Sequence, residues 1–481
     1  MSPSVSRPMA ALAGACLFAT AFCADAATYY VATTGSNGAN GLTPATAFRN
    51  IQYAVGRVAP GDSIQVRAGT YVENVTISRA GTSAQWITLQ AYPGEIPLLR
   101  SSGSGPTVYF YHSDCDEDTV GNGSGNTDCH AMHWNVQGLD IQGSPLGGGD
   151  GNVVKIDTPK VRLTGNRLCC SKADVVKVVR TANDVGIIGN EIWQDAAVVA
   201  PGSNAQGIDI VGADRPHVAG NYIHDVPDIG VYAKGNSRNA LFERNRLVNI
   251  GGPSNGNALM LGQSTDAERL LDGNYESYDG IVRNNVVVGA TYACLATSSS
   301  SNARFYNNSC YDTARTGQAS IYVSNESEIG TAGSGLVFVN NIVHGNAGRP
   351  VVKLGSSGMT DYSTLVFARN LFHVAGGSPQ FYASDFFNPV GFAQWQTRFL
   401  QLTGHAETGV AADPRFAVTT GTTPLTLSAG SPAIDTGETA TAWVPDDFNG
   451  NPRPAGASFD IGAYESGAND GIFRAGFETG V

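Results

Sequence analysis

The stretch Val185-Gly186-Ile187-Ile188-Gly189-Asn190-Glu191-Ile192 is one copy of a motif that recurs through the middle of the chain. A Gly-Asn pair separates two short runs in which apolar residues alternate with other residues. Residues 161–168 repeat the pattern. Because successive side chains of a β-strand point to opposite faces, this alternation predicts two short strands joined at the asparagine.

The repeated asparagines set the period of the chain. They are Asn166, Asn190, Asn221, Asn245, Asn285, Asn308, Asn341 and Asn370. The closest members of this series lie 23 or 24 residues apart, and longer intervals carry inserts. A period of this length is typical of a solenoid coil. We interpret the asparagines as structural turn residues, at bends that require a left-handed backbone.

A further short strand is predicted before each asparagine motif. These strands share an apolar–any–apolar pattern at 154–156, 176–178, 208–210, 231–233, 259–261, 321–323 and 352–354. Coils of this kind stack and share one core. We therefore predict an all-β fold, a right-handed parallel β-helix built as a single-stranded solenoid.

The two ends of the repeat carry different patterns. Residues 47–58 have apolar positions at helical spacing, which predicts a helix that caps the N-terminal end of the core. The block Tyr30-Val31, Gly41, Ala54-Val55, Pro60-Gly61-Asp62 and Ala68-Gly69-Thr70-Tyr71 resembles the N-terminal segment of secreted bacterial β-helix proteins. Residues 431–435, 447–453 and 460–465 resemble the module that closes many such proteins at the C-terminus.

The first residues have the features of a secretory signal. Arg7 precedes an apolar run from Met9 to Phe22, and Ala24-Asp25-Ala26 fits a small–any–small cleavage site. The run is too short to span a membrane, and no later segment is long and apolar enough. We expect a secreted monomer, extracellular, periplasmic or attached to the cell surface. The expected division is 1–26 signal peptide, 27–100 N-terminal cap and first coils, 101–133 acidic disulfide loop, 134–375 β-helix repeats, 376–466 C-terminal coils and cap module, and 467–481 tail.

Six cysteines follow the predicted signal, an even number that suits an oxidising compartment. We expect Cys115 to pair with Cys129 and Cys294 to pair with Cys310. Cys169-Cys170 leaves two possibilities open, a vicinal bridge or separate partners. Spacing for a metal site is absent around the closest histidines, His130 and His133, so no zinc site is expected. The acidic residues 114 and 116–118 form either a solvated loop or a Ca²⁺ site.

The net charge of −12, with 29 Lys and Arg against 41 Asp and Glu, argues against a nucleic-acid partner. The same charge repels an acidic sugar unless local cations or Ca²⁺ bridge it. Aligned repeats place outward residues in a ladder with a spacing of about 4.8 Å, which suits an extended polysaccharide. The ladder consists of Lys155, Lys177, Asp209, Tyr232, Met260, Tyr322 and Lys353.

Lys234 is the residue most suited to catalysis. Elimination from a uronide needs a base that removes the proton next to the carboxylate and a cation that stabilises the resulting charge. Lys234 is the candidate base, with Arg215 and Arg238 as the neighbouring catalytic cations. The candidate Ca²⁺ ligands are Asp209, Asp225 and Asp228. The candidate substrate-binding residues are Tyr232, His224, Lys177 and Gln263.

Residues 228–237, Asp-Ile-Gly-Val-Tyr-Ala-Lys-Gly-Asn-Ser, followed by Phe-Glu-Arg-Asn at 242–245, resemble the pectate-lyase-like β-helix lyases, which include chondroitinase B-like and alginate lyases. The resemblance implies a catalytic lysine at Lys234 and, more loosely, a Ca²⁺ ligand at Asp228. In those enzymes the next coil carries a catalytic arginine, where this chain has Gly262 and Gln263. Family-nine pectate lyases use a lysine with a Ca²⁺-binding aspartate cluster instead.

These observations favour binding and β-eliminative cleavage of an acidic, uronate-containing polysaccharide. Two alternatives stay open. A polygalacturonase-like glycoside hydrolase needs paired carboxylates, which Asp209 and Asp228 supply, although its Asn-any-Asp and Asp-Asp motifs are absent. A non-catalytic adhesin or glycan-binding protein is the other, since a lysine on a β-helix face is commonly a solvated charge. Which polysaccharide is bound does not follow from the sequence.

Overall fold

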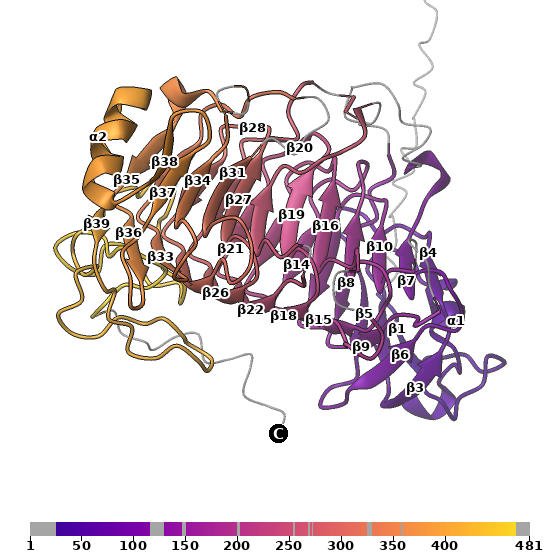
Figure 1. The fold of residues 1–481 in the computed structure, drawn as a ribbon. Coiled ribbons are helices and arrows are strands. Elements are labelled where there is room, and N and C mark those ends of the chain that lie inside the picture. The colour runs from indigo at the N-terminus through magenta and orange to yellow at the C-terminus, as the bar shows by residue number, and fades with distance from the viewer. Residues whose placement is uncertain are drawn as a thin grey trace, which may run out of the picture.

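A computed structural model describes residues 26–115, 129–146, 151–199, 203–253, 255–267, 270–271, 273–324, 330–356, 358 and 360–467. Over these residues the chain winds into a parallel β-helix in which each coil adds one strand to each of three long sheets (Figure 1). This confirms the predicted fold class. Nearly all of the predicted signal peptide and tail, and residues 116–118, lie outside the described residues.

Sheet A and sheet B meet at the asparagine bends. Sheet A consists of β1 (Thr28–Val31), β2 (Ser63–Val66), β5 (Ile87–Ala91), β8 (Trp134–Gln137), β11 (Val161–Thr164), β14 (Gly186–Ile188), β17 (His217–Ala219), β21 (Leu241–Glu243), β25 (Ile281–Arg283), β29 (Arg304–Tyr306), β32 (Val337–Val339) and β35 (Val366–Ala368). Sheet B consists of β3 (Gly69–Val72), β6 (Pro97–Arg100), β9 (Asp140–Gln142), β12 (Arg167–Cys169), β15 (Glu191–Trp193), β18 (Tyr222–Val226), β22 (Arg246–Ile250), β26 (Val286–Ala290), β30 (Ser309–Thr313), β33 (Ile342–Gly345), β36 (Leu371–Val374) and β39 (Val410–Ala411).

Sheet C contains the strands predicted before each asparagine motif. It consists of β4 (Val75–Ile77), β7 (Val108–Phe110), β10 (Val154–Ile156), β13 (Val176–Val178), β16 (Ile208–Val211), β19 (Val231–Lys234), β23 (Leu259–Leu261), β27 (Leu295–Ser298), β31 (Ile321–Ser324), β34 (Val352–Leu354), β37 (Phe381–Ala383) and β38 (Phe387–Val390). The sequence analysis missed β27. Short strands β20 (Ser237–Arg238), β24 (Ser277–Tyr278) and β28 (Ser300–Ser301) form a small sheet beside sheet C.

The repeated asparagines form one continuous hydrogen-bonded ladder between sheets A and B. In a typical step, the backbone N–H of Asn221 donates to Oδ1 of Asn245 (3.0 Å) and its Nδ2 donates to the same oxygen (2.9 Å). Nδ2 of Asn245 in turn donates to the carbonyl of Val218 (2.9 Å) and to Oδ1 of Asn285 (3.0 Å). The same contacts run from residue 166 to residue 370, and every ladder side chain is buried.

The left-handed residue at each bend is the one before the ladder asparagine. In early coils it is a glycine, such as Gly189 (φ 63°). In three later coils it is Asn284, Asn307 or Asn340, with φ between 51° and 58°. The Asn-Asn pairs therefore divide two tasks, since the second asparagine continues the ladder and the first adopts the left-handed bend.

The first asparagine of each such pair also holds the C-terminal segment. Nδ2 of Asn284 donates to the carbonyl of Asp446 (2.8 Å), Nδ2 of Asn307 to that of Asp460 (2.9 Å), and Nδ2 of Asn340 to that of Glu438 (2.8 Å). The segment after β39, yellow in Figure 1, thus lies along the outside of the last coils. This arrangement explains why the Gly-Asn pairs change to Asn-Asn pairs along the sequence.

A helix lies at each end of the apolar core. At the N-terminal end, η1 (Pro44–Thr46) precedes α1 (Ile51–Val55), which buries Ile51 and Val55 in the core. The predicted helix over 47–58 is therefore present but shorter. At the other end, α2 (Phe392–Thr403) buries Trp395 and Phe399. The remaining 3₁₀ turns are η2 (Ser113–Cys115) and η4 (Tyr362–Thr364).

The cysteines pair as three disulfides. Cys115–Cys129 and Cys294–Cys310 confirm the two predicted bridges. Cys169–Cys170 is a vicinal bridge, which settles the open alternative. Among the described residues, no helix has the length and apolar character needed to cross a bilayer.

The ladder yields a first prediction. Asn245→Ala leaves the buried N–H groups of Asn221 and the carbonyl of Val218 without their partners. Each unpaired buried group costs about 1–3 kcal/mol, so we expect a loss of about 3 kcal/mol or more in the free energy of unfolding. Urea unfolding followed by circular dichroism measures it. The exposed Asn388→Ala is the control; equal urea midpoints for the two variants would show that the ladder contributes no special stability.

Candidate active site

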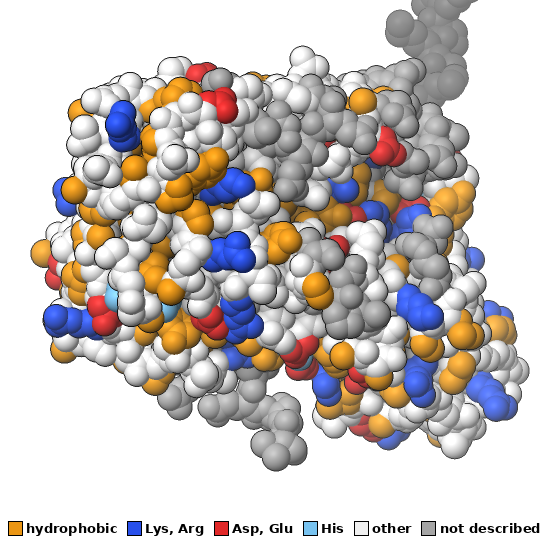
Figure 2. Space-filling view, in the orientation of Figure 1, with side chains coloured by type: hydrophobic (Ala, Val, Ile, Leu, Met, Phe, Trp, Pro, Cys, Tyr) orange, Lys and Arg blue, Asp and Glu red, His pale blue; other side chains and the backbone are white. Residues whose placement is uncertain are grey.

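The outer face of sheet C carries the predicted ladder. Strand pairing aligns Lys155, Lys177, Asp209, Tyr232 and Met260 on five consecutive strands. The ladder continues through Ala296, which the sequence analysis omitted, to Tyr322 and Lys353. On the described part of the face that Figure 2 shows, basic side chains lie among acidic and uncharged ones rather than in one basic area.

A buried carboxyl cluster lies at the middle of this ladder. Asp209 is 2% exposed, Asp174 6% and Asp228 7%. Asp209 is the central residue of β16, whereas Asp174 and Asp228 lie in the bends that lead from sheet B into β13 and β19. Nζ of Lys177 pairs with Oδ2 of Asp209 and lies 3.7 Å from Oδ2 of Asp174.

Gln206 links two of the three carboxylates. Its backbone N–H donates to Oδ1 of Asp174 (3.1 Å), and its side-chain Nε2 donates to Oδ2 of Asp228 (2.7 Å). Gln206 lies two residues before β16, the strand of Asp209, and its backbone and side chain contact carboxyl groups of the coils on either side. Gln206 holds the carboxyl groups of Asp174 and Asp228, and Lys177 pairs with that of Asp209, so the three groups lie beside consecutive strands of sheet C.

Several buried oxygens of this cluster have no hydrogen-bond partner within the described part of the chain. They are Oδ1 of Asp209, Oδ1 of Asp228 and Oε1 of Gln206. Buried polar atoms in native proteins are nearly always paired with protein, water or an ion. All three are oxygens of the kind that Ca²⁺ prefers; in the described structure the three carboxylates are not close enough together to share an ion, so binding one requires their side chains to move.

Burial also changes the protonation of the cluster. It raises the pKa of Asp174 to about 8, and the nearby Asp209 carboxylate adds to the rise while Lys177 opposes it. Burial raises the pKa of Asp228 to about 6, a rise that hydrogen bonds from Gln206 and Asn255 limit. At neutral pH, without a bound cation, Asp174 therefore holds a proton.

Lys234 lies beside this cluster. It pairs in register with Val211, at the end of the strand whose Tyr232 pairs with Asp209. Its Nζ lies 5.2 Å from the centroid of the Tyr232 ring and donates to the carbonyl of Ser264 (3.2 Å). Its side chain is half-buried. Lys234 thus follows the carboxyl cluster along the same face.

The loop above Lys234 is held by a residue that the sequence analysis missed. Glu276 is fully buried and accepts from the backbone N–H of Gly235 (3.0 Å) and from both N–H and Oγ1 of Thr265 (2.9 and 2.8 Å). It therefore ties the strand end at Lys234 to the segment containing Ser264. The candidate Gln263 lies in that segment, half-buried.

The two candidate arginines lie on the bend that follows sheet C. They are neighbours, since the backbone N–H of Arg215 donates to the carbonyl of Arg238 (2.7 Å). The guanidinium of Arg215 donates twice to Asp184 (2.7 and 3.0 Å), and that of Arg238 lies 4.0 Å from the centroid of the Tyr278 ring. The guanidinium of Arg215 therefore pairs with Asp184 and not with a member of the carboxyl cluster.

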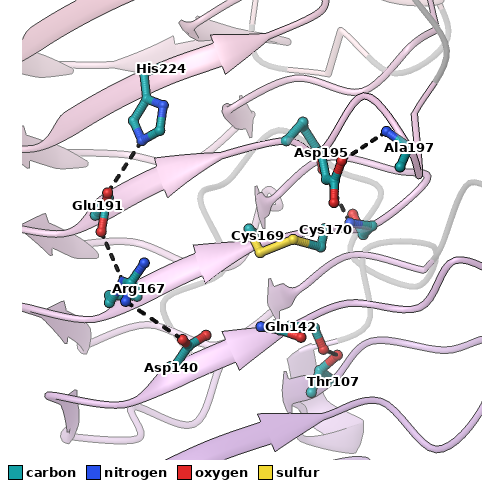
Figure 3. The surroundings of a disulfide bond; sticks show 12 residues. Thr107, Asp140, Gln142, Arg167, Cys169, Cys170, Glu191, Asp195, Ala197 and His224 are labelled. Atoms are coloured by element: carbon teal, nitrogen blue, oxygen red, sulfur yellow. Dashed lines mark hydrogen bonds and ion pairs between the residues drawn. A yellow bond between two sulfur atoms is a disulfide. The ribbon is translucent and has the colours of Figure 1, made fainter. Parts of the chain in front are cut away.

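His224 and Asp225 lie on a different sheet from the cluster. Both belong to β18 in sheet B, where Nδ1 of His224 contacts Oδ2 of Asp225 (2.7 Å). Figure 3 shows the row that His224 joins, which runs through Glu191 and Arg167 to Asp140 beside the vicinal disulfide. The structure therefore does not bring Asp225 together with Asp209 and Asp228; Asp174 is the third carboxylate there.

The sequence contained a signal for the missed residues. A polar side chain precedes each sheet C strand by two or three positions in five consecutive coils: Asn152, Asp174, Gln206, Asp228 and Asn257. Strand periodicity predicts only the outward positions within the strands. Because the bends from sheet B stack as regularly as the strands, their polar residues form a second row next to the ladder.

Comparisons with known proteins agree on the fold. No protein-family model matches the chain, and no curated protein sequence matches it significantly. Among solved structures, the pectate lyase Pel9A superposes over 91% of this chain and 96% of its own, with a TM-score of 0.58 and 14% identity. XylC in complex with xylose superposes over 92% and 99%, with a TM-score of 0.54 and 12% identity. At these identities the likeness shows the β-helix fold.

The raised pKa values give the second prediction. Unfolded aspartates lose their protons near pH ~3.9, whereas folded Asp228 and Asp174 keep theirs up to pH about 6 and about 8. The unfolded state therefore binds fewer protons over this range, and the free energy of unfolding falls as pH rises from about 4 to about 8.

We expect a lower urea midpoint near pH ~9 than near pH ~5 in Ca²⁺-free buffer. In Asp174→Asn this difference shrinks, because the amide does not titrate. Exposed Asp413→Asn should retain the wild-type difference. An undiminished pH dependence in Asp174→Asn would mean that Asp174 is ionised in the folded protein.

Proposed function

We propose that this chain is a polysaccharide lyase, which binds an acidic, uronate-containing polysaccharide along sheet C and cleaves it by β-elimination. The observation that carries the proposal is the buried carboxyl cluster with unpartnered oxygens, one strand from Lys234. Elimination next to a uronate needs a base, and it needs positive charge near the substrate carboxylate. Lys234 is the base in this proposal, and a Ca²⁺ ion held by the carboxyl cluster supplies the positive charge.

Asp174, Asp209 and Asp228 would hold a Ca²⁺ ion. Their oxygens and the side-chain oxygen of Gln206 make an all-oxygen donor set, and two carboxylate oxygens already lack partners. When bound, Ca²⁺ supplies positive charge that neutralises the substrate carboxylate and acidifies the neighbouring carbon. Binding requires ionised carboxylates, so the proton on Asp174 leaves as the ion enters.

Lys234 has the role of the base. Its Nζ takes the proton from the carbon next to the uronate carboxylate, the electrons form a carbon–carbon double bond, and the glycosidic oxygen leaves and gains a proton from solvent. The loop fixed by Glu276 positions the Lys234 amino group, which donates to the Ser264 carbonyl and must be the neutral amine to act as the base. Glu276 therefore positions Lys234 and is not itself a catalytic group.

The likeness to Pel9A supports this assignment, since that protein is a pectate lyase with the same fold over nearly its full length. Three disulfides also support export, because such bridges persist in oxidising compartments. The polymer would lie across successive coils, whose strand spacing of about 4.8 Å repeats along the face.

A hydrolase is the second candidate, and one observation favours it. Asp174 is protonated at neutral pH, as the general acid of a glycosidase is, and Asp209 is a neighbouring carboxyl group. The fold of XylC, solved with xylose, matches this chain as well. In that reaction Asp174 would protonate the leaving oxygen, and Lys234 would have no proton to remove from carbon.

The third prediction separates these reactions. With pectate, alginate and glycosaminoglycans as substrates, a lyase generates the ultraviolet absorbance of unsaturated uronides, dependent on Ca²⁺. Lys234→Ala should reduce kcat/KM by about 10²–10⁴-fold, the usual contribution of a general base. Lys353→Ala, four strands further along sheet C, should keep most of the activity.

The other outcomes are equally specific. Reducing ends that accumulate without ultraviolet absorbance, and that depend on Asp174 but not on Lys234, would establish the hydrolase. Binding of the polymers without any cleavage would identify a glycan-binding protein and contradict both enzymatic proposals.

A further inference from the structure

A second group of metal-ligating side chains lies away from the carboxyl cluster. His112 and Asp114 follow β7, and His130 lies just before β8. One ligand atom from each of the three residues can be chosen so that all lie within 4.8 Å of one another. Oδ2 of Asp114 is 3.4 Å from Nδ1 of His112 and 3.9 Å from Nδ1 of His130.

These distances are close to those of a zinc site. With bonds of about 2.0–2.1 Å, the ligands of a tetrahedral Zn²⁺ lie about 3.3–3.4 Å apart, so side-chain rotations are needed to bring all three donors to one ion. The His112 and His130 rings stack, with centroids 4.5 Å apart and planes 14° from parallel, so the two rings are close together but must turn before their in-plane nitrogen lone pairs meet at one ion. Two long hydrogen bonds compete with an ion for these donors: the backbone N–H of Asp114 donates to Nδ1 of His112, and Oγ of Ser113 donates to Oδ1 of Asp114, both at 3.4 Å.

The backbone around the group is constrained on both sides. Cys115 follows Asp114 directly, Cys129 precedes His130, and the two cysteines form a disulfide. The carbonyl of Cys115 also accepts from Oγ1 of Thr181 (3.0 Å), on the coil of β13. The segments that carry the donors are therefore joined to each other and to the solenoid before any ion binds.

The side chains remain accessible to an incoming ion. His130 is 55% exposed and Asp114 56%, while His112 is 25% exposed. Two neutral imidazoles and one carboxylate carry a single negative charge, and nitrogen donors select borderline transition metals over Ca²⁺. We propose that His112, Asp114 and His130 form a binding site for a divalent transition-metal ion, with Zn²⁺ as the best match.

The predicted absence of a zinc site rested on the spacing of His130 and His133, the closest histidines in the sequence. The structure directs His133 elsewhere, with Nδ1 3.1 Å from the carbonyl of Ala131 and its ring edge-on to Trp86 at 5.4 Å. The partner of His130 is His112, eighteen residues earlier, which the disulfide brings close. Spacing along the chain could not show a contact that depends on this bridge.

The fourth prediction tests the site with tag-free protein. Isothermal titration with Zn²⁺ should show one ion per chain. His112→Ala and His130→Ala should each raise the Kd at least tenfold, while His133→Ala and exposed His405→Ala leave it unchanged. Excess Ca²⁺ should not displace the ion, and acidification should release it, because imidazole binds metal only when neutral.

Folding of each variant is checked by circular dichroism, and Zn²⁺ should raise the thermal midpoint of wild type but not of the His112 and His130 variants. Unchanged Zn²⁺ affinity in both variants, or no binding to wild type, overturns the proposal. In that case the group is an ion pair between Asp114 and its two histidines. None of these readouts depends on lyase activity.

Discussion

The asparagine ladder is the interaction on which the rest of this structure depends. Each step satisfies buried backbone groups of two coils with one side chain, and a missing link would leave them unpaired in the core. The ladder also fixes the bend between sheets A and B at two residues, as at 189–190 and 340–341. Within the coils that the ladder joins, the inserted residues therefore lie in the other two bends. The polar residues Asp174, Gln206 and Asp228 lie in one of these, the bend from sheet B to sheet C.

The two faces that carry charged ladders differ in how their charges are paired. On sheet B, the acidic residues Asp140 and Glu191 alternate with Arg167 and His224, and each acid has a neighbour that carries donor nitrogens. Such partly exposed pairs contribute little individually and form a structural row. On sheet C, Lys177 pairs with two of the three buried carboxyl groups, Asp174 and Asp209, whereas Asp228 is hydrogen-bonded to the neutral side chain of Gln206. This excess of buried acid is costly for folding alone, which is why a cation or a proton is expected there.

The two proposed metal sites differ in chemistry as well as in position. The sheet C cluster offers buried oxygens, which suit Ca²⁺, and it adjoins the proposed base. The group of His112, Asp114 and His130 offers nitrogen donors at the surface beside a disulfide, which suit Zn²⁺. Selectivity between the ions follows from donor type, so each site can be tested in the presence of the other ion.

Much of the fold was predictable from the sequence, because strand periodicity and repeated asparagines are local signals. The sheet C strands around Lys177, Asp209 and Tyr232 were placed correctly, and so was the ladder that they form. The candidate site was predictable only in part. Asp225 lies on β18 of sheet B, whereas Asp228 lies in the bend that follows. The two residues are only three positions apart in the sequence, so nothing in the sequence indicates that a bend separates them. Asp174 was missed because it lies in a bend, where strand periodicity gives no information.

The central claim is that the carboxyl cluster on sheet C is a cation site, and calorimetric titration with Ca²⁺ at neutral pH tests it most directly. Wild type should bind one Ca²⁺ and release about one proton per chain, because the ion displaces the proton held by Asp174. Asp209→Asn should abolish the binding, while Asp225→Asn, on sheet B, should preserve it. Ca²⁺ binding that survives Asp209→Asn and is lost with Asp225→Asn would contradict the account.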